Sequence, residues 1–129
     1  MICVRPLFAK RAAFALGLAL QHTPQGFAAD NFHKLRDADI RARLVGMEIT
    51  DGVHWAEQYM RDGTYKAFHM GKPRMGKWYA RNGELCLVEG KGEPECKEVW
   101  ESGGKVEFRG ETSGLPPMEG VLQKQQKRE

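Results

Sequence analysis

The sequence predicts a mainly β protein: a small antiparallel meander or barrel of about seven to eight strands, lipocalin-like in outline and preceded by one short helix. From Leu44 onward, short apolar or alternating runs are separated by turn dipeptides, and fifteen of the 129 residues are glycine. Asp-Gly, Asn-Gly and Gly-Gly favour hairpin turns because positive φ is accessible to them. No long helical pattern interrupts residues 44–110, so neighbouring strands are expected to pair antiparallel.

The first 28 residues predict a cleaved secretory signal peptide. Arg5, Lys10 and Arg11 precede an apolar run at 12–20, and small residues follow, with Ala28 just before the expected cleavage site. The apolar run is too short for a stable bilayer span. A buried N-terminal helix is the alternative interpretation. We therefore expect a periplasmic or secreted protein with no membrane span after cleavage.

Cleavage would also balance the charge of the chain. The full sequence has 20 Lys plus Arg and 17 Asp plus Glu, and removing the three bases of the signal leaves 17 of each. The basic character therefore belongs to the signal and gives no reason to expect nucleic-acid binding. The remaining length allows one modest core, so we expect a single domain and a monomer. The basic end QKQQKRE is expected to be a solvated tail.

Residues 29–43 predict an N-terminal amphipathic helix. Asp30 or Asn31 can cap it, and acids precede arginines along the segment, as the helix dipole favours. The apolar positions at roughly helical spacing are Phe32, Leu35, Ile40 and Leu44. Such a helix could bind a membrane surface, but Asp37 and Asp39 argue against that interpretation. We expect it to pack on the barrel.

Residues 44–110 are predicted to form the barrel core, and 111–129 a C-terminal extension. Two-residue turns at Asn82-Gly83 and Gly103-Gly104 fix the register of the strands that flank them. In that register, one face collects the apolar residues expected to form the core or a ligand pocket: Trp78, Leu85, Leu87, Val99, Val106 and Phe108.

The same register places both cysteines of the mature chain on the opposite, polar face. Cys3 leaves with the signal, so Cys86 and Cys96 form an even pair in adjacent predicted strands. A redox couple or two metal thiolates are alternatives, but there is no CxxC spacing and no histidine nearby. We predict a structural disulfide between these two cysteines, on the outside of the hairpin.

The histidines raise the question of a metal site. If Asp62-Gly63 is also a two-residue turn, Ala56 faces His69, and His54 lies diagonally across from His69 on the same face. No HxH or HxxxH spacing supports metal binding, so we predict no metal site. The pattern of residues 55–70 does not decide which face of these strands points inward.

No catalytic constellation is apparent. The acids lie mostly at predicted turns or on polar strand faces, and Ser102 and Ser113 fall in loops without a partner histidine. The segment EGKGEP follows a predicted strand but opens no helix, so it is interpreted as a hairpin loop rather than a phosphate loop. We therefore predict a protein that is not an enzyme and needs no cofactor.

The order helix–LVG–strand–DGT–strand–GKW–NGELC–EC–EVW–VEFRG resembles small uncharacterised exported proteins of Gram-negative bacteria with a lipocalin-like barrel. The resemblance covers roughly residues 35–110. The matching positions are Gly46, Asp62, Gly63, Thr64, Gly76, Trp78, Asn82, Gly83, Cys86, Cys96, Val99 and Trp100. These are mostly turn and core residues, so the resemblance implies a fold far more than a function.

Two classes of function fit these expectations. The first is a non-catalytic binding protein that holds a small apolar or amphiphilic ligand in the mouth of the barrel. The second is an envelope protein-interaction or inhibitor-like module that acts through its loops and through exposed aromatic residues such as Trp100. A cavity lined by the apolar set would favour the first, and a filled core beside an exposed apolar patch would favour the second.

Overall fold

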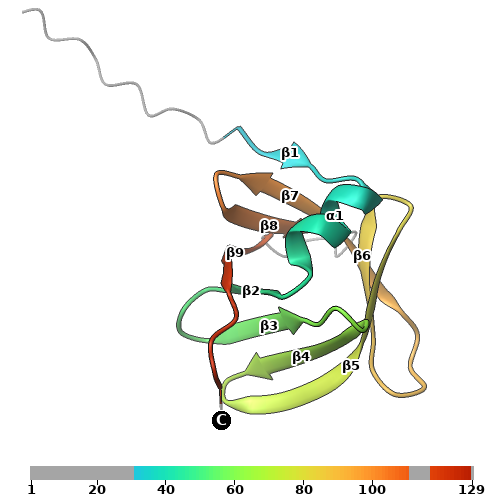
Figure 1. The fold of residues 1–129 in the computed structure, drawn as a ribbon, viewed down its shortest axis with the longest axis vertical. Coiled ribbons are helices and arrows are strands. Elements are labelled where there is room, and N and C mark those ends of the chain that lie inside the picture. Colours follow the sequence, from blue (N-terminus) through green and yellow to red (C-terminus); the bar gives the residue numbers. More distant parts are fainter. Residues whose placement is uncertain (1–30, 111–116, 129) are drawn as a thin grey trace, which may run out of the picture.

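The structure, a computed structural model, describes residues 31–110 and 117–128 and shows a closed antiparallel barrel (Figure 1). Eight strands follow one another in chain order, each paired with the next, and the last pairs with the first. A ninth strand, β1, is added to β7. The elements are β1 (His33–Lys34), α1 (Asp37–Leu44), β2 (Met47–Thr50), β3 (Trp55–Tyr59), β4 (Thr64–His69), β5 (Lys72–Arg81), β6 (Glu84–Val88), β7 (Glu95–Ser102), β8 (Lys105–Arg109) and β9 (Met118–Lys124). The predicted fold class is confirmed.

Two of the predicted turns set the strand register as expected. Asn82 and Gly83 both have positive φ, as do Gly103 and Gly104. The structure pairs Arg81 with Glu84 across the first turn and Val99 with Phe108 after the second. All six predicted apolar residues, from Trp78 to Phe108, are therefore buried in one core cluster.

The register expected across Asp62-Gly63 is wrong by one residue. His69 pairs with Trp55 rather than with Ala56. The Met60 N–H donates to the Thr64 carbonyl at 2.8 Å, which leaves three residues in the loop, and Gly63 has a φ of +87°. A three-residue hairpin loop with glycine in the left-handed position is a common alternative to the two-residue turn. His54 and His69 therefore lie on opposite faces, because they differ by one step from the paired position.

The N-terminal helix is shorter than predicted. Residues 33 and 34 pair with β7 as a strand, and the Leu35 N–H donates to the Val99 carbonyl at 2.8 Å, so the chain stays extended until Asp37. Ile40 and Leu44 of α1 are fully buried. The Asp37 carboxylate accepts a 2.6 Å hydrogen bond from the Gly83 N–H and fixes the helix against the β5–β6 turn. No helix within residues 31–110 and 117–128 is long and apolar enough to cross a membrane.

The prediction that the barrel ends at residue 110 is wrong. β9 closes it by pairing with both β8 and β2. Gly120 makes this closure feasible, because a Cβ there would lie 2.9 Å from side-chain atoms of Ile49 and of Trp55. The polar sequence MEGVLQK hides this strand from a search for apolar runs. The predicted signal peptide, residues 1–28, lies outside the described residues.

The basic end is not a solvated tail over its described part. The Arg128 side chain donates two hydrogen bonds, of 3.0 and 3.1 Å, to the carboxylate of Glu48, which is fully buried on the outer face of β2. The Gln58 side chain donates to the Gln126 carbonyl at 2.7 Å. We name residues 125–128 the C-terminal strap, because they run over the outside of β2 and β3.

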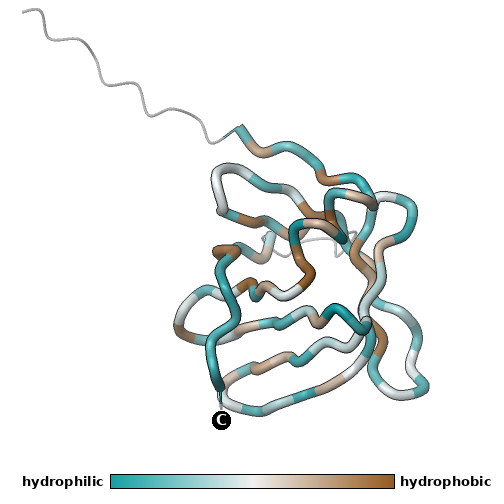
Figure 2. The backbone as a smooth tube through the Cα atoms, in the orientation of Figure 1, coloured by the Kyte–Doolittle hydropathy of each residue, from teal (hydrophilic) through white to brown (hydrophobic). Residues whose placement is uncertain are grey.

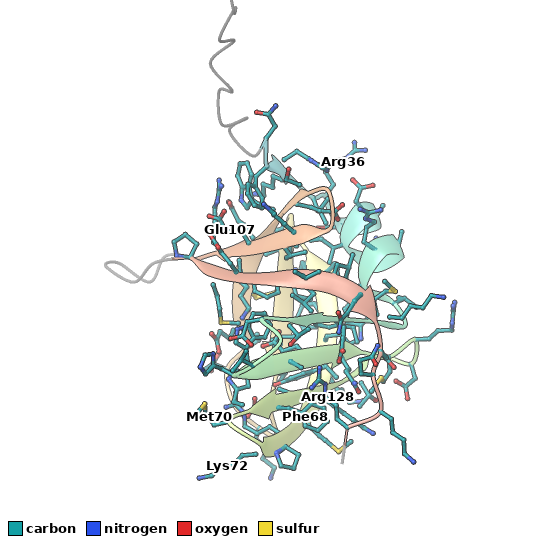
Figure 3. The ribbon with its side chains drawn as sticks, turned by 90° about the vertical axis from the view of Figure 1, so that its left-hand side faces the viewer. Arg36, Phe68, Met70, Lys72, Glu107 and Arg128 are labelled. Carbon is teal, nitrogen blue, oxygen red and sulfur yellow. A yellow bond between two sulfur atoms is a disulfide. The ribbon has the colours of Figure 1, made fainter. Side chains whose placement is uncertain are left out.

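The two ends of the barrel differ in what covers them. In an up-and-down barrel the connections alternate between the ends, so α1 lies at the same end as the β3–β4, β5–β6 and β7–β8 turns. The β2–β3, β4–β5 and β6–β7 connections lie at the other end, which no helix covers within the described residues. Figure 3 shows Arg36, just before α1, far from Met70 and Lys72 at the β4–β5 turn. We call these the closed end and the open end.

Hydropathy also differs between the sides of the barrel. Hydrophobic residues gather where α1, β2, β6 and β8 approach one another, whereas β3, β4 and β5 are mostly hydrophilic (Figure 2). The core nearest the closed end contains Ile40, Leu44, Tyr59, Trp78 and Leu85. Tyr59 and Trp78 make an edge-to-face contact with ring centroids 5.6 Å apart. This packed layer leaves the open end as the place to look for a site.

Candidate functional site

Inward positions on the strands change from apolar to polar toward the open end. Because side chains alternate along a strand, Tyr59 and Glu57 both point inward from β3, with Glu57 nearer the open end. Val99 and Lys97 are related in the same way on β7. On these two strands the inward row is therefore apolar at the closed end and charged at the next inward position toward the open end.

These charged residues surround a cavity of about 280 Å³ at the open end. Its wall includes apolar groups from Tyr65, Leu87 and Met118 between the polar ones. The full lining is Glu57, Tyr65, His69, Arg74, Leu87, Glu89, Gly92, Glu93, Glu95, Lys97 and Met118. The volume is near the lower end of small-molecule sites.

Glu57 is the most deeply buried carboxylate of this cavity. It is 3% exposed, and its Oε2 accepts a 2.6 Å hydrogen bond from the Tyr59 hydroxyl. Burial by itself would raise the pKa of Glu57, but interactions with His69, Lys97 and Tyr59 outweigh burial and lower the pKa below its ordinary value. Glu57 is therefore a buried carboxylate that stays ionised at neutral pH.

Tyr59 acts as the fixed donor to that carboxylate. The pKa of Tyr59 is raised well above its ordinary value by its complete burial and by the neighbouring Glu57 charge. The phenol consequently keeps its proton and holds Glu57 in place. Its role is to position Glu57, because its own ring belongs to the packed core.

His69 faces Glu57 across a short gap. Its Nε2 lies 3.7 Å from Glu57 Oε1, which is too far for a hydrogen bond. This ring nitrogen is buried and has no hydrogen-bond partner among the described residues. A buried polar atom left in this way normally has a missing partner, such as a water or a ligand group.

A second polar pair lies on the adjacent wall of the cavity. The Tyr65 hydroxyl donates to Glu89 Oε1 at 2.6 Å, and the Arg74 Nε lies 3.5 Å from the same oxygen. Partial burial and the hydrogen bond to Glu89 raise the pKa of Tyr65 well above its ordinary value. This pair links β4, β5 and the start of the β6–β7 loop, so it shapes the rim.

Lys97 approaches the cavity from β7. Its ammonium group lies 4.6 Å from the centre of the Phe108 ring, within the range of a cation–π contact. It makes no hydrogen bond to Glu57 in the part of the chain that the structure describes. Its charge acts on Glu57 through space and leaves the carboxylate oxygen Oε1 open to another donor.

Of the six residues predicted to form a core or pocket, Leu87 alone is also among those that line this cavity. The other five lie in the packed core. The polar residues that dominate the site were missed, because the register of β3 and β4 decides which face they occupy. With the correct register, alternation along β3 and β4 places Glu57 and His69 on the same inner face and so indicates the site.

The histidine pair considered for a metal is separated by the corrected register. The His54 Nδ1 lies 2.8 Å from Asp51 Oδ2 in the β2–β3 loop, away from the cavity that His69 lines. Over residues 31–110 and 117–128, no three His, Cys, Asp or Glu side chains are grouped so as to hold a metal ion.

The two cysteines lie directly opposite each other in the β6–β7 ladder, with sulfur atoms 2.09 Å apart. They alternate with Leu85 and Leu87, so they are on the outer side of the barrel wall, as predicted from the register. Cys86 is nevertheless only 3% exposed. The disulfide fixes the hairpin whose loop supplies Gly92 and Glu93 to the cavity.

Comparison of the chain with protein families, with curated proteins and with solved structures finds no match at a significant level.

Proposed function

We propose that this chain is a non-catalytic, monomeric β-barrel of the periplasm or of the extracellular medium that binds a small amphiphilic molecule in its open end. The observation that carries the proposal is the cavity of about 280 Å³, which has a buried carboxylate at its inner wall. Small-molecule sites are concave and use placed polar groups to orient the ligand, and this cavity combines many polar groups with a smaller apolar wall.

The composition of the wall favours an amphiphile over a purely apolar ligand. Tyr65, Leu87 and Met118 provide apolar surface, but Glu57 and Lys97 lie within the same space. An entirely apolar ligand would bury these charges without partners, which is unfavourable. A molecule with one polar end and one short apolar end matches both parts of the wall.

Export is supported by two features of the chain. The order of basic, apolar and small residues over 1–28 is that of a secretory signal, and the remaining two cysteines lie at bonding distance. The resemblance to small exported Gram-negative proteins with a lipocalin-like barrel agrees with this proposal, and the closed eight-strand meander is compatible with it.

A protein-interaction role is the second candidate, and exposed apolar side chains at the open end favour it. Val53 and Met70 are 82% and 75% exposed, in the β2–β3 and β4–β5 connections. Trp100 is a weaker candidate for contact, because its indole N–H donates to Glu98 and Arg109 lies over its ring at 4.0 Å. A partner would then bind around the rim rather than inside the barrel.

Titration calorimetry with 1-hexanol tests the first proposal. We expect saturable binding at one site in the wild-type protein. Met118→Trp should abolish it by filling the cavity, whereas Glu119→Trp, which points to the outside on the same strand, should leave it unchanged. Binding that survives Met118→Trp would contradict a site in the cavity.

Native mass spectrometry of the protein purified from its own envelope separates the two candidates. A retained mass of a few hundred daltons supports the small-molecule role. A retained protein, released by Val53→Ser and Met70→Ser but not by Met118→Trp, would support the interaction role instead.

A further inference from the structure

Two neighbouring polar atoms on residues that line the cavity lack hydrogen-bond partners within the described residues. The Tyr59 hydroxyl binds Oε2 of Glu57. The other oxygen, Oε1, makes no hydrogen bond within the described residues. His69 Nε2 is buried and also unbonded. The two atoms are 3.7 Å apart, too far to bond each other and close enough for one small group to bond both.

The charge of the cavity indicates what that group is. Four carboxylates line it, against the two cations Arg74 and Lys97. Arg74 is occupied by Glu89 at 3.5 Å, and the Lys97 ammonium lies against the Phe108 ring. An anionic ligand group would meet excess negative charge, whereas a cationic group would reduce it.

We infer that the polar group of the ligand is a primary ammonium, held between Glu57 Oε1 and His69 Nε2. This inference rests on the proposed function and specifies its ligand class as a small alkyl amine. An ammonium nitrogen at about 2.8 Å from each acceptor spans their separation with two of its N–H groups. The third N–H and the carbon chain then point toward the rest of the cavity. With the amine bound, His69 accepts in its neutral form with the proton on Nδ1, so the ammonium replaces the imidazole as the counter-charge of Glu57.

Other groups satisfy this arrangement less well. A hydroxyl group could bond both atoms but would leave the Glu57 charge without a new counter-charge. A metal ion would find two protein ligands here, fewer than the sites metals usually occupy, and no larger group exists among the described residues. The alkyl part of an amine would lie along Leu87 and Met118, which complete the apolar wall.

Calorimetric titration with n-hexylamine, 1-hexanol and hexanoate at pH 7 tests the inference, because these probes share a chain and differ in the polar end. We expect hexylamine to bind about tenfold or more tightly than hexanol, since a charge-assisted hydrogen bond to a buried carboxylate is stronger than a neutral one. Hexanoate should bind more weakly than either.

Glu57→Gln should remove the amine preference, so that hexylamine and hexanol bind within about threefold of each other, because glutamine keeps an acceptor for the Tyr59 hydroxyl but carries no charge. His69→Phe provides a second variant that reduces the preference without touching the carboxylate. Glu93→Gln, a change to a rim carboxylate of the same cavity, is the matched control and should keep most of it.

These measurements distinguish failure of the ammonium site from failure of the amphiphile-binding cavity. Hexanol binding without an amine preference, an amine preference that survives Glu57→Gln, or tighter binding of hexanoate would each overturn the ammonium site and leave the amphiphile cavity standing. Binding of none of the three probes would overturn both proposals.

Discussion

At the closed end of the barrel, β3 and β7 place Tyr59 and Val99 inward, while two residues nearer the open end the same strands place Glu57 and Lys97 inward. Both pairs occupy equivalent inner positions, so strand geometry does not distinguish them. They differ in whether other side chains pack over them and exclude water. At the closed end α1 covers the barrel, and the inner side chains pack against it.

The closed end of the barrel stabilises the fold, whereas the open end leaves space for binding. The closed end packs Ile40, Leu44 and Leu85 at full burial, and such packing supplies most of the free energy of folding in a domain of this size. The open end instead retains a buried carboxylate and an imidazole nitrogen without a partner. A buried polar group without a partner calls for an explanation, and a binding role is the one that we propose for these two.

The closed end also contains a buried carboxylate. Glu101 is a buried carboxylate near the closed end, and the side chain of Arg43 donates to it at 2.9 Å from α1. This carboxylate is fully engaged in fastening the helix to the barrel. The Glu57 carboxylate has one oxygen engaged and one facing a cavity, which is the arrangement expected of a binding group.

The largest expected effect is at the closed end. Ile40→Ala should lower the free energy of unfolding by about 2–5 kcal/mol, because Ile40 is fully buried and the barrel end cannot collapse around the void. Val53→Ala at the open end is the matched control and should change it by less than about 0.5 kcal/mol. Urea unfolding followed by circular dichroism measures both. Equal losses at the two positions would contradict the division between the ends.

The disulfide comes next. Replacing both Cys86 and Cys96 by serine should cost about 2–4 kcal/mol and leave the fold recognisable, because the bond links neighbouring strands from outside the core. Hydrogen exchange should rise most in the loop at 89–94, which lines the open end, and least in α1.

Thiol titration of the denatured, unreduced protein provides the control for that experiment. No free thiol should be found in the mature chain. Single replacements should be worse than the double one, since the remaining thiol can form dimers between molecules under oxidising conditions. Two titratable thiols would show that Cys86 and Cys96 are not bonded.

Most of the fold could be predicted because its turns have recognisable sequences. Asn82-Gly83 and Gly103-Gly104 require positive φ, and once they are placed, alternation assigns the faces of the four strands around them. β9 was missed because its inner residues include Gly120, whose small size matters through contacts with distant strands. Local sequence carries no trace of that requirement.

The candidate site could not be predicted for a related reason. A two-residue and a three-residue loop at Asp62-Gly63 are both compatible with the local sequence, and they differ by one residue in register. That slip moves every side chain of β3 to the other face relative to β4. Only the three-residue loop places Glu57 and His69 on the same inner wall, so the site depends on a detail that the packed barrel decides.

A smaller effect is expected on the outer wall between the two ends. Burial alone would raise the pKa of Glu48, but hydrogen bonds from Arg128, Gln123 and Gln58 outweigh it and lower the pKa below 4.5. The ionised group therefore stabilises the folded state above pH 4.5, and that contribution is lost as the pH falls through the lowered pKa. Arg128→Ala should cost about 1–2 kcal/mol at pH 7.

Measurements of the free energy of unfolding below pH 7 test why Arg128→Ala is destabilising. The difference between wild type and Arg128→Ala should shrink as the pH falls below 4.5, because protonated Glu48 no longer needs the guanidinium. Arg36→Ala, which removes a highly exposed arginine before α1, should have little effect at any pH. A loss for Arg128→Ala that is independent of pH would mean that the C-terminal strap acts by packing alone.

The smallest effect on stability should be at the group with the largest expected effect on binding. Glu57→Gln keeps an acceptor for the Tyr59 hydroxyl. It removes both the cost of burying a charge and the attraction of that charge to His69 and Lys97, and these two effects oppose each other. We expect the free energy of unfolding to change by about 1 kcal/mol or less, measured by the same urea titration as Ile40→Ala. A loss above about 2 kcal/mol would mean that Glu57 fastens β3 to its neighbours, as Glu101 fastens α1. A near-neutral result together with lost amine binding would separate the packed end from the binding end at a single carboxylate.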